Sequence, residues 1–183
     1  MNLKYLLINP IRKLSLLVVV TLLLTSCAVY EIQDAEPFDM NVKWVMLPMI
    51  NHSDTPDAGA RAADIAETLV RSRGITQLSQ YEPQPDSKNI LELDQKKELS
   101  EAINWAKQKG YNFGLSGSVQ EWRYKSGLDG EPAAGITLTV IDIDNGQVIW
   151  SASGSRTGWG RESVSGVAHK LLAVLIDGLE LRK

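Results

Sequence analysis

Apolar and polar positions alternate over the middle of the chain and predict three consecutive β-strands. From residue 113 to residue 125, apolar residues and glycine alternate with serine and glutamine, which is the period-two pattern of a half-buried strand. A strand rich in Ile, Val and Thr follows at 136–143, and a third begins after Asn145–Gly146, a strong hairpin signal. The pattern therefore predicts an antiparallel meander whose first loop, 127–132, holds two glycines and a proline.

A nearly continuous apolar run precedes this meander and predicts a strand that is covered on both faces. The run spans 42–50, and Pro48 should make its end irregular. A helix is expected next, with Thr55 as its cap, Pro56 at its first position and Gly74 just past its end.

The remaining elements complete an α/β pattern. A short strand is expected at 75–78, a loop at 80–88 and a helix at about 94–109. Ser163 opens a last helix with an apolar stripe at helical spacing, formed by Val164, Val167, Ala168, Leu171, Leu172, Leu175, Ile176 and Leu179. We expect this stripe to pack on the sheet; a coiled-coil partner is the alternative. The order β-α-β-α-β-β-β-α predicts a single α/β domain over 42–183, with helices packed on a mixed β-sheet.

Residues 1–26 have the organisation of a lipoprotein signal peptide. Basic residues precede an apolar run at 14–24, which is too short to span a bilayer. Small residues then lead to Cys27, an arrangement that resembles the bacterial lipobox, so we expect Cys27 to become the acylated, for example palmitoylated, N-terminus. Ala28 follows in place of aspartate, which favours the outer membrane. The alternative is a plain signal peptide or a short membrane anchor with an incidental cysteine.

The chain after cleavage is acidic. Removing residues 1–26 removes three of the 19 basic residues and none of the 22 acidic ones, so the formal net charge moves from −3 to −6. This charge argues against nucleic acid as a partner and is compatible with a cationic ligand. Residues 27–41 hold four carboxylates and little apolar periodicity, which predicts an acidic tether between the lipid and the domain.

Catalytic motifs do not occur in the sequence. There is no nucleophile elbow, zinc-protease motif, phosphate-binding loop or dinucleotide fingerprint, and lipidation would consume the one cysteine. His52 lies beside Asp54 after a strand, but no serine, cysteine or ligand set is spaced to use it, so a polar loop residue is the better interpretation. Residues 142–146 resemble a calcium loop with its glycine misplaced and fit a hairpin better. We expect no enzymatic activity, no cofactor and no metal.

Several short segments together resemble the PelC family of outer-membrane lipoproteins, which serve Pel exopolysaccharide export. The segments are Trp44–Met49 with Asn51, Thr55–Gly59, Glu121–Pro132, Trp150–Gly154 and Gly158–Glu162. The resemblance covers most of the chain from residue 43 onward. It implies a fold similar to the TolB N-terminal domain and CsgG-type lipoproteins.

The same resemblance implies partners and a location. It implies a homo-oligomer, a ring of twelve copies, that faces the periplasm beneath the outer-membrane β-barrel porin PelB. Its cargo would be a cationic, partly deacetylated amino-sugar polymer that is exported during biofilm formation.

Three residues are candidates for that function besides Cys27. Asp129 and Glu131 lie on the glycine- and proline-flanked loop and would form a polysaccharide-guiding acidic surface when a ring repeats them. Trp159 lies between two glycines and would be an aromatic membrane contact. The alternatives are a solvated turn for the two carboxylates and a core position under the last helix for Trp159.

Two functional hypotheses follow from these observations. The first is a lipid-anchored ring that guides an exported polysaccharide to a porin. The second is a monomeric lipid-anchored protein of the cell envelope that binds or modifies sugars. The oligomeric state of the protein separates them.

Overall fold

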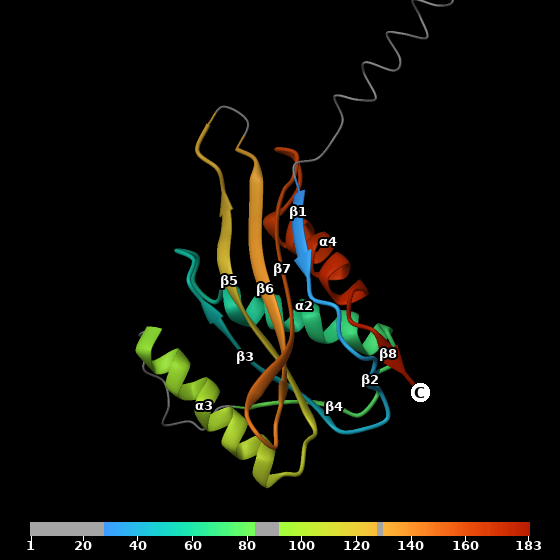
Figure 1. The fold of residues 1–183 in the computed structure, drawn as a ribbon. Coiled ribbons are helices and arrows are strands. Elements are labelled where there is room, and N and C mark those ends of the chain that lie inside the picture. Colours follow the sequence, from blue (N-terminus) through green and yellow to red (C-terminus); the bar gives the residue numbers. More distant parts are fainter. Residues whose placement is uncertain (1–27, 83–91, 128–129) are drawn as a thin grey trace, which may run out of the picture.

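A mixed six-stranded sheet lies at the centre of the computed structural model, which describes residues 28–82, 92–127 and 130–183 (Figure 1). The strand order is β1-β7-β6-β5-β3-β4. β3 runs parallel to β4 and β5, whereas β5, β6, β7 and β1 pair successively in antiparallel. The strands are β1 (Ala28–Ile32), β3 (Trp44–Asn51), β4 (Leu78–Gln80), β5 (Phe113–Tyr124), β6 (Pro132–Asp142) and β7 (Gln147–Thr157). The α/β class and the mixed sheet are confirmed.

The predicted meander is present as β5, β6 and β7. Its second turn contains Gly146, whose φ of 71° is a left-handed conformation that glycine adopts without strain. The Gly146 amide donates to the Asp142 carbonyl at 2.8 Å, and the Asn145 side chain accepts from the Gln147 amide at 2.8 Å. The Asn-Gly signal therefore marked a real turn.

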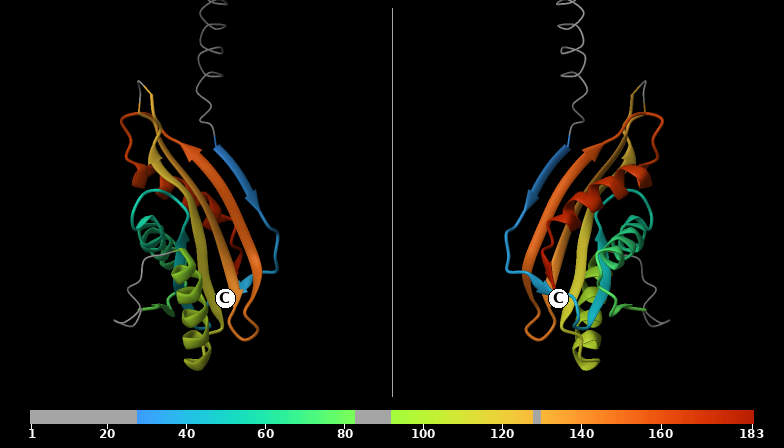
Figure 2. Two further views of the ribbon diagram at one scale, coloured as in Figure 1. Left: turned by 90° about the vertical axis from the view of Figure 1, so that its left-hand side faces the viewer. Right: turned by 90° about the vertical axis from the view of Figure 1, so that its right-hand side faces the viewer.

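Helices cover the two faces of the sheet unequally. α2 (Ala58–Ser72) and α4 (Val164–Asp177) pack on one face, and α3 (Glu92–Gln108) packs on the other, mainly against β3 (Figures 1 and 2). Away from α3, that second face of β5, β6, β7 and β1 carries no helix. All eight apolar residues of the predicted stripe are buried, and the Ser163 hydroxyl caps α4 by accepting from the Gly166 amide at 3.0 Å. Packing of this helix on the sheet is confirmed.

The predicted start of α2 is wrong. The helix begins at Ala58, and the Thr55 hydroxyl donates to the Trp122 carbonyl on β5 instead of capping it. Asp57 precedes the helix with a φ of 59°, a conformation that a non-glycine residue adopts at a cost. Gly59 lies so close to β3 that a Cβ there would be 2.2 Å from the Met49 carbonyl oxygen. The start of α2 therefore has no side-chain cap and lies close to β3.

The tether predicted at 27–41 is wrong over its described part, 28–41. β1 pairs along its whole length with β7, and β2 (Phe38–Asp39) pairs in parallel with β8 (Leu181–Arg182). Phe38 is 7% exposed and contacts the rings of Trp44 and Phe113 at centroid distances of 6.0 and 5.4 Å. The folded domain therefore includes residues 28–41, because these strands contribute apolar side chains to its core.

The short strand after α2 begins later than the sequence predicted. The short strand expected at 75–78 is β4 at 78–80, and Ile75 is a fully buried core residue before it.

Residues 1–27, 83–91 and 128–129, which include the predicted signal peptide, Cys27 and Asp129, lie outside the described residues. No helix in the described part of the chain is long and apolar enough to cross a membrane.

Candidate functional site

Three segments that are distant in sequence meet at the end of the sheet where β1 begins, which we call the Ala28 end (Figure 1). Ala28 pairs with Arg156 near the end of β7. The Lys125 ammonium, just after β5, donates to the Thr157 hydroxyl at 2.8 Å. The β5–β6 loop and the turn from β7 to α4 therefore lie beside the first residue after the predicted lipidation site.

Trp159 is on the surface at the Ala28 end, with 64% of its area exposed. Gly158 brings the turn against α4, because a Cβ there would lie 2.4 Å from Val167 Cγ2. The Gly158 amide donates to the Pro132 carbonyl at 2.8 Å, which holds the turn on β6. A core position for Trp159 is therefore wrong; its membrane role stays a prediction.

A second exposed aromatic residue lies at the same end and was missed in the sequence. Tyr124 is 54% exposed, and its hydroxyl is 3.5 Å from the Glu162 carbonyl oxygen in the β7–α4 turn. Lys125 and Arg161 are also exposed there. The signal that could have found Tyr124 is its position at the end of β5, beyond the buried Trp122.

The Glu162 carboxylate also fixes this turn. It accepts a hydrogen bond at 2.8 Å from the ammonium of Lys170, which lies on α4. This hydrogen bond is the largest cause that lowers the pKa of Glu162. Desolvation opposes it, and the Lys170 charge, a backbone hydrogen bond from Trp159 and the Arg156 charge lower the pKa further. The Glu162 amide donates to the Trp159 carbonyl at 2.8 Å, so the ion pair and Trp159 belong to one turn.

Glu131 lies on the β5–β6 loop, as the sequence predicted, and is half-buried. Its carbonyl accepts from the Lys125 amide at 2.7 Å, and Gly130 before it has a φ of 50°. Asp129 and Cys27 lie outside the described residues. The structure thus positions Glu131 at the Ala28 end, and its role in guiding a polymer stays a prediction.

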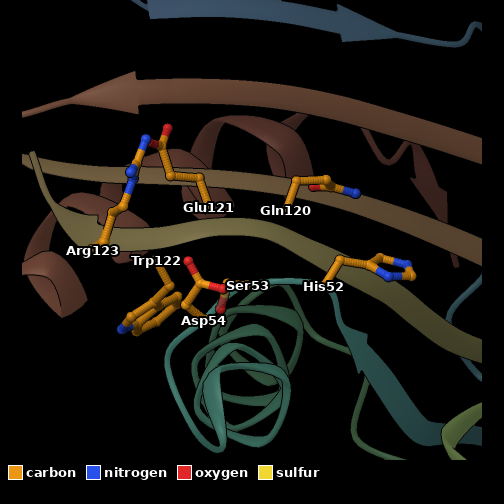
Figure 3. Close-up of a pocket in the computed structure, with 7 residues that line it drawn as sticks. All are labelled: His52, Ser53, Asp54, Gln120, Glu121, Trp122 and Arg123. Carbon is orange, nitrogen blue, oxygen red and sulfur yellow. The ribbon is translucent and has the colours of Figure 1, made fainter. Parts of the chain in front are cut away.

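A separate polar pocket, with a volume of about 300 Å³, lies between the end of β3 and β5 (Figure 3). One wall is the loop after β3, and the other is the second half of β5. The residues that line it are His52, Ser53, Asp54, Gln120, Glu121, Trp122 and Arg123. His52 is therefore a loop residue, as predicted, but it contributes to a pocket that the sequence did not reveal.

Asn51 shapes the loop wall of this pocket. Its side-chain oxygen accepts from the Ser53 amide at 3.0 Å, and its side-chain nitrogen donates to the Thr55 carbonyl at 2.8 Å. Its own backbone amide donates to the Gln95 side chain of α3 at 2.7 Å, and the His52 amide donates to the Val119 carbonyl of β5 at 2.8 Å. These bonds hold the loop against β5 and α3.

An irregularity in β5 shapes the other wall. The pairing of β5 with β6 shifts between Val119 and Glu121, so that Gln120 is an extra residue. Gln120 and Glu121 both line the pocket, whereas the Trp122 indole points toward α2 and is 3% exposed (Figure 3). The Arg123 guanidinium pairs with the Glu121 carboxylate at 2.9 Å.

The charges of the pocket do not cancel. Glu121 and Arg123 neutralise one another, whereas Asp54 is exposed and no ion pair is found for it among the described residues. Among the Asp, Glu and Arg side chains of the lining, two carboxylates therefore face one guanidinium. Nowhere in 28–82, 92–127 or 130–183 do three His, Cys, Asp or Glu side chains group as metal ligands would.

Comparison with solved structures identifies the family. A PelC dodecamer from Paraburkholderia phytofirmans matches with a TM-score of 0.72 and 34% sequence identity, over 86% of this chain and 100% of that chain. The chain belongs to the PelC family. A single-residue variant of the same PelC dodecamer, in another space group, matches with 35% identity and the same TM-score over 85% of this chain. No protein-family model matches the chain, and no curated protein matches it.

PelC membership confirms the resemblance that the sequence segments indicated. The segment Trp44–Met49 falls on β3, and the segment Glu121–Pro132 begins in the part of β5 that lines the pocket. The segment Gly158–Glu162 is the turn that presents Trp159. The end of β5 and the β7–α4 turn lie at the Ala28 end, whereas Trp44–Met49 begins beside Phe113, toward the other end of the sheet.

Proposed function

We propose that this protein is a lipid-anchored, periplasm-facing component of the outer membrane that assembles into a ring. The ring guides a cationic Pel exopolysaccharide to the outer-membrane porin PelB during export and biofilm formation. Membership of the PelC family, whose solved relatives are dodecamers, is the observation that carries this proposal. We infer that the protein acts without catalysis.

The Ala28 end supports the proposed placement on the membrane. Lipid attached at Cys27 would join the chain directly before β1, without an intervening tether. Trp159 and Tyr124 are exposed at the same end, together with the cations Lys125 and Arg161. Aromatic residues and cations favour the bilayer interface, and stable anchoring needs a second contact besides one acyl chain. Cys27 and Trp159 would supply these two contacts.

The acidic loop supports the proposed handling of a cationic polymer. Glu131 lies on the β5–β6 loop at the Ala28 end, and Asp129 is two positions before it in the sequence. A ring would repeat both carboxylates once per subunit and concentrate negative potential at its mouth, where the polymer passes to the porin. Each exposed contact would contribute about 1 kcal/mol or less, so the polymer can both enter and leave.

The experiment that tests the proposal is complementation of a deletion strain. Cells without this gene product should lose polysaccharide secretion, and the wild-type protein should restore it. The Cys27→Ser protein should stay uncleaved or lack its membrane anchor, and it should therefore restore secretion poorly. Full secretion in the deletion strain, with the other export components present, would contradict the proposed function.

A further inference from the structure

Three cations gather around the β7–α4 turn at the Ala28 end (Figure 1). Arg156 lies near the end of β7, and Arg161 is exposed in the turn itself. Lys125 reaches the same place from another segment, because its ammonium donates to the Thr157 hydroxyl at 2.8 Å. We call these three cations the basic cluster.

The basic cluster is a locally positive surface on an acidic chain. Glu162 is paired with Lys170 at 2.8 Å, which leaves Glu131 as the carboxylate that opposes the cluster among the described residues of the loop and the turn. Even with Asp129 counted from the sequence, three cations face two carboxylates. The excess of positive charge therefore lies beside the predicted lipid, whereas the mature chain as a whole is negative.

The guanidinium of Arg156 is held in place without a carboxylate partner. Its Nη1 donates to the Tyr30 hydroxyl of β1 at 3.2 Å, and no ion pair is found for it in the part of the chain that the structure describes. Its Nε is buried without a hydrogen-bond partner there. A guanidinium binds the oxygens of a phosphate through its N–H groups, so Arg156 has donors left for an external anion.

We propose that the basic cluster, together with Trp159, binds the phosphate groups of anionic phospholipids. The inference rests on the proposed function for the attachment at Cys27, and it adds the class of lipid that the membrane contact selects. Ala28 pairs with Arg156, so a lipid on Cys27 would bring the bilayer to within one residue of this surface.

An exposed indole and neighbouring cations suit two depths of one membrane interface. Trp159, which is 64% exposed, favours the region beside the acyl chains, whereas ammonium and guanidinium groups stay with the headgroups. The indole contributes whatever the charge of the lipid, and the basic cluster contributes in proportion to the negative surface potential. Lipid composition therefore separates the two contributions.

Carboxylates of a neighbouring copy are the competing partner for the basic cluster, because the chain is acidic overall. Two observations favour the membrane. Arg156 pairs with the residue that directly follows the predicted lipidation site, and Arg161 lies two positions after an exposed indole. A subunit contact would instead bury that indole.

Partition of the mature Cys27→Ser protein onto vesicles tests this inference. Vesicles of phosphatidylcholine are compared with vesicles of equal parts phosphatidylcholine and phosphatidylglycerol, and the protein should prefer the mixed ones. Arg161→Gln should weaken binding to the mixed vesicles about five-fold, the contribution of one cation near an anionic surface, and should leave binding to phosphatidylcholine unchanged. Lys125→Gln combined with Arg161→Gln should remove most of the preference.

Matched variants separate charge from other effects. Lys107→Gln with Lys109→Gln also removes two cations, but near the β6–β7 turn at the other end of the sheet, and should partition like the parent. Trp159→Ala should weaken binding to both kinds of vesicle by the same factor. Arg156→Lys, which keeps the charge but not the guanidinium, should bind the mixed vesicles more tightly than Arg156→Gln.

Several results would overturn the inference. They are equal partition of the parent onto both kinds of vesicle, and equal effects of the Lys125–Arg161 and Lys107–Lys109 changes. Tight binding of inorganic phosphate without vesicles would identify a soluble anion as the ligand, and a lower oligomer mass in Arg161→Gln would identify a subunit contact. Failure of the proposed function is a separate result, because it appears as normal secretion in the deletion strain whatever the vesicles show.

Discussion

Ala28 pairs with Arg156, three residues before the exposed Trp159. This pairing ties the start of the mature chain to the turn that presents the tryptophan. A lipid on Cys27 and the Trp159 ring would then approach one surface together, although 132 positions separate them in sequence.

Replacing Trp159 with alanine should weaken membrane binding without unfolding the protein. The side chain is mostly exposed, so its loss removes interfacial contact and little core packing. Partition onto phospholipid vesicles should fall roughly ten-fold in a Cys27→Ser background, where the lipid does not dominate.

The control for this prediction is Val148→Ala, which removes another exposed apolar side chain at the start of β7, away from the Ala28 end. It should leave vesicle partition unchanged. Equal partition for Trp159→Ala and its parent would remove Trp159 from membrane attachment.

Replacing Phe38 with alanine should destabilise the domain by about 3 kcal/mol, because it removes a buried ring that packs between Trp44 and Phe113. Urea unfolding measures the change. Glu36→Ala, two positions earlier and exposed, should change the free energy of unfolding by less than about 0.5 kcal/mol. If both variants were silent, residues 28–41 would behave as the tether that the sequence predicted.

The structure of residues 28–41 could not be predicted from local sequence patterns. The stripe of α4 was predictable because residues three and four apart define one face locally. β1 has five residues, of which only Tyr30 and Ile32 pack on the core, among acidic neighbours. Its partner β7 lies more than a hundred positions later, so no local pattern announces the pairing.

The parts of the candidate site that depend on local sequence were predictable, and the part that depends on long-range contacts was not. An exposed Trp159 and a loop around Glu131 follow from their glycine and proline neighbours. The pocket does not, because it needs an extra residue at Gln120 and a Thr55–Trp122 bond that spans 67 positions. Because the Thr55 hydroxyl forms this bond, it does not cap α2, the role that its sequence context favoured.

The Glu162–Lys170 pair should make stability depend on acidic pH. The pKa of Glu162 is lowered in the folded state, so its contribution is complete above the ordinary value of 4.5 and is lost as the pH falls through the folded value. Melting temperatures of the wild type and Glu162→Gln should therefore differ most near neutral pH and converge below pH 4.5. High salt should shrink the difference, since the pair is exposed. A gap that persists unchanged at low pH would exclude this ion pair as its source.

Changing Asp129 and Glu131 to their amides should lower polysaccharide secretion, more in the double variant than in either single one. The physical reason is the loss of negative potential at the mouth of the ring. Secretion is measured at constant protein level. Asp64→Asn with Glu67→Gln, on α2, is the matched control and should secrete normally. Unchanged export in the double loop variant, with the oligomer intact, would remove these carboxylates from the mechanism.

Assembly into a ring is the central claim, and the mass of the lipid-free mature protein in solution tests it most directly. Multi-angle light scattering over a range of concentrations should give a closed oligomer, with about twelve copies as in the solved PelC relatives. A strict monomer at high concentration would contradict the account.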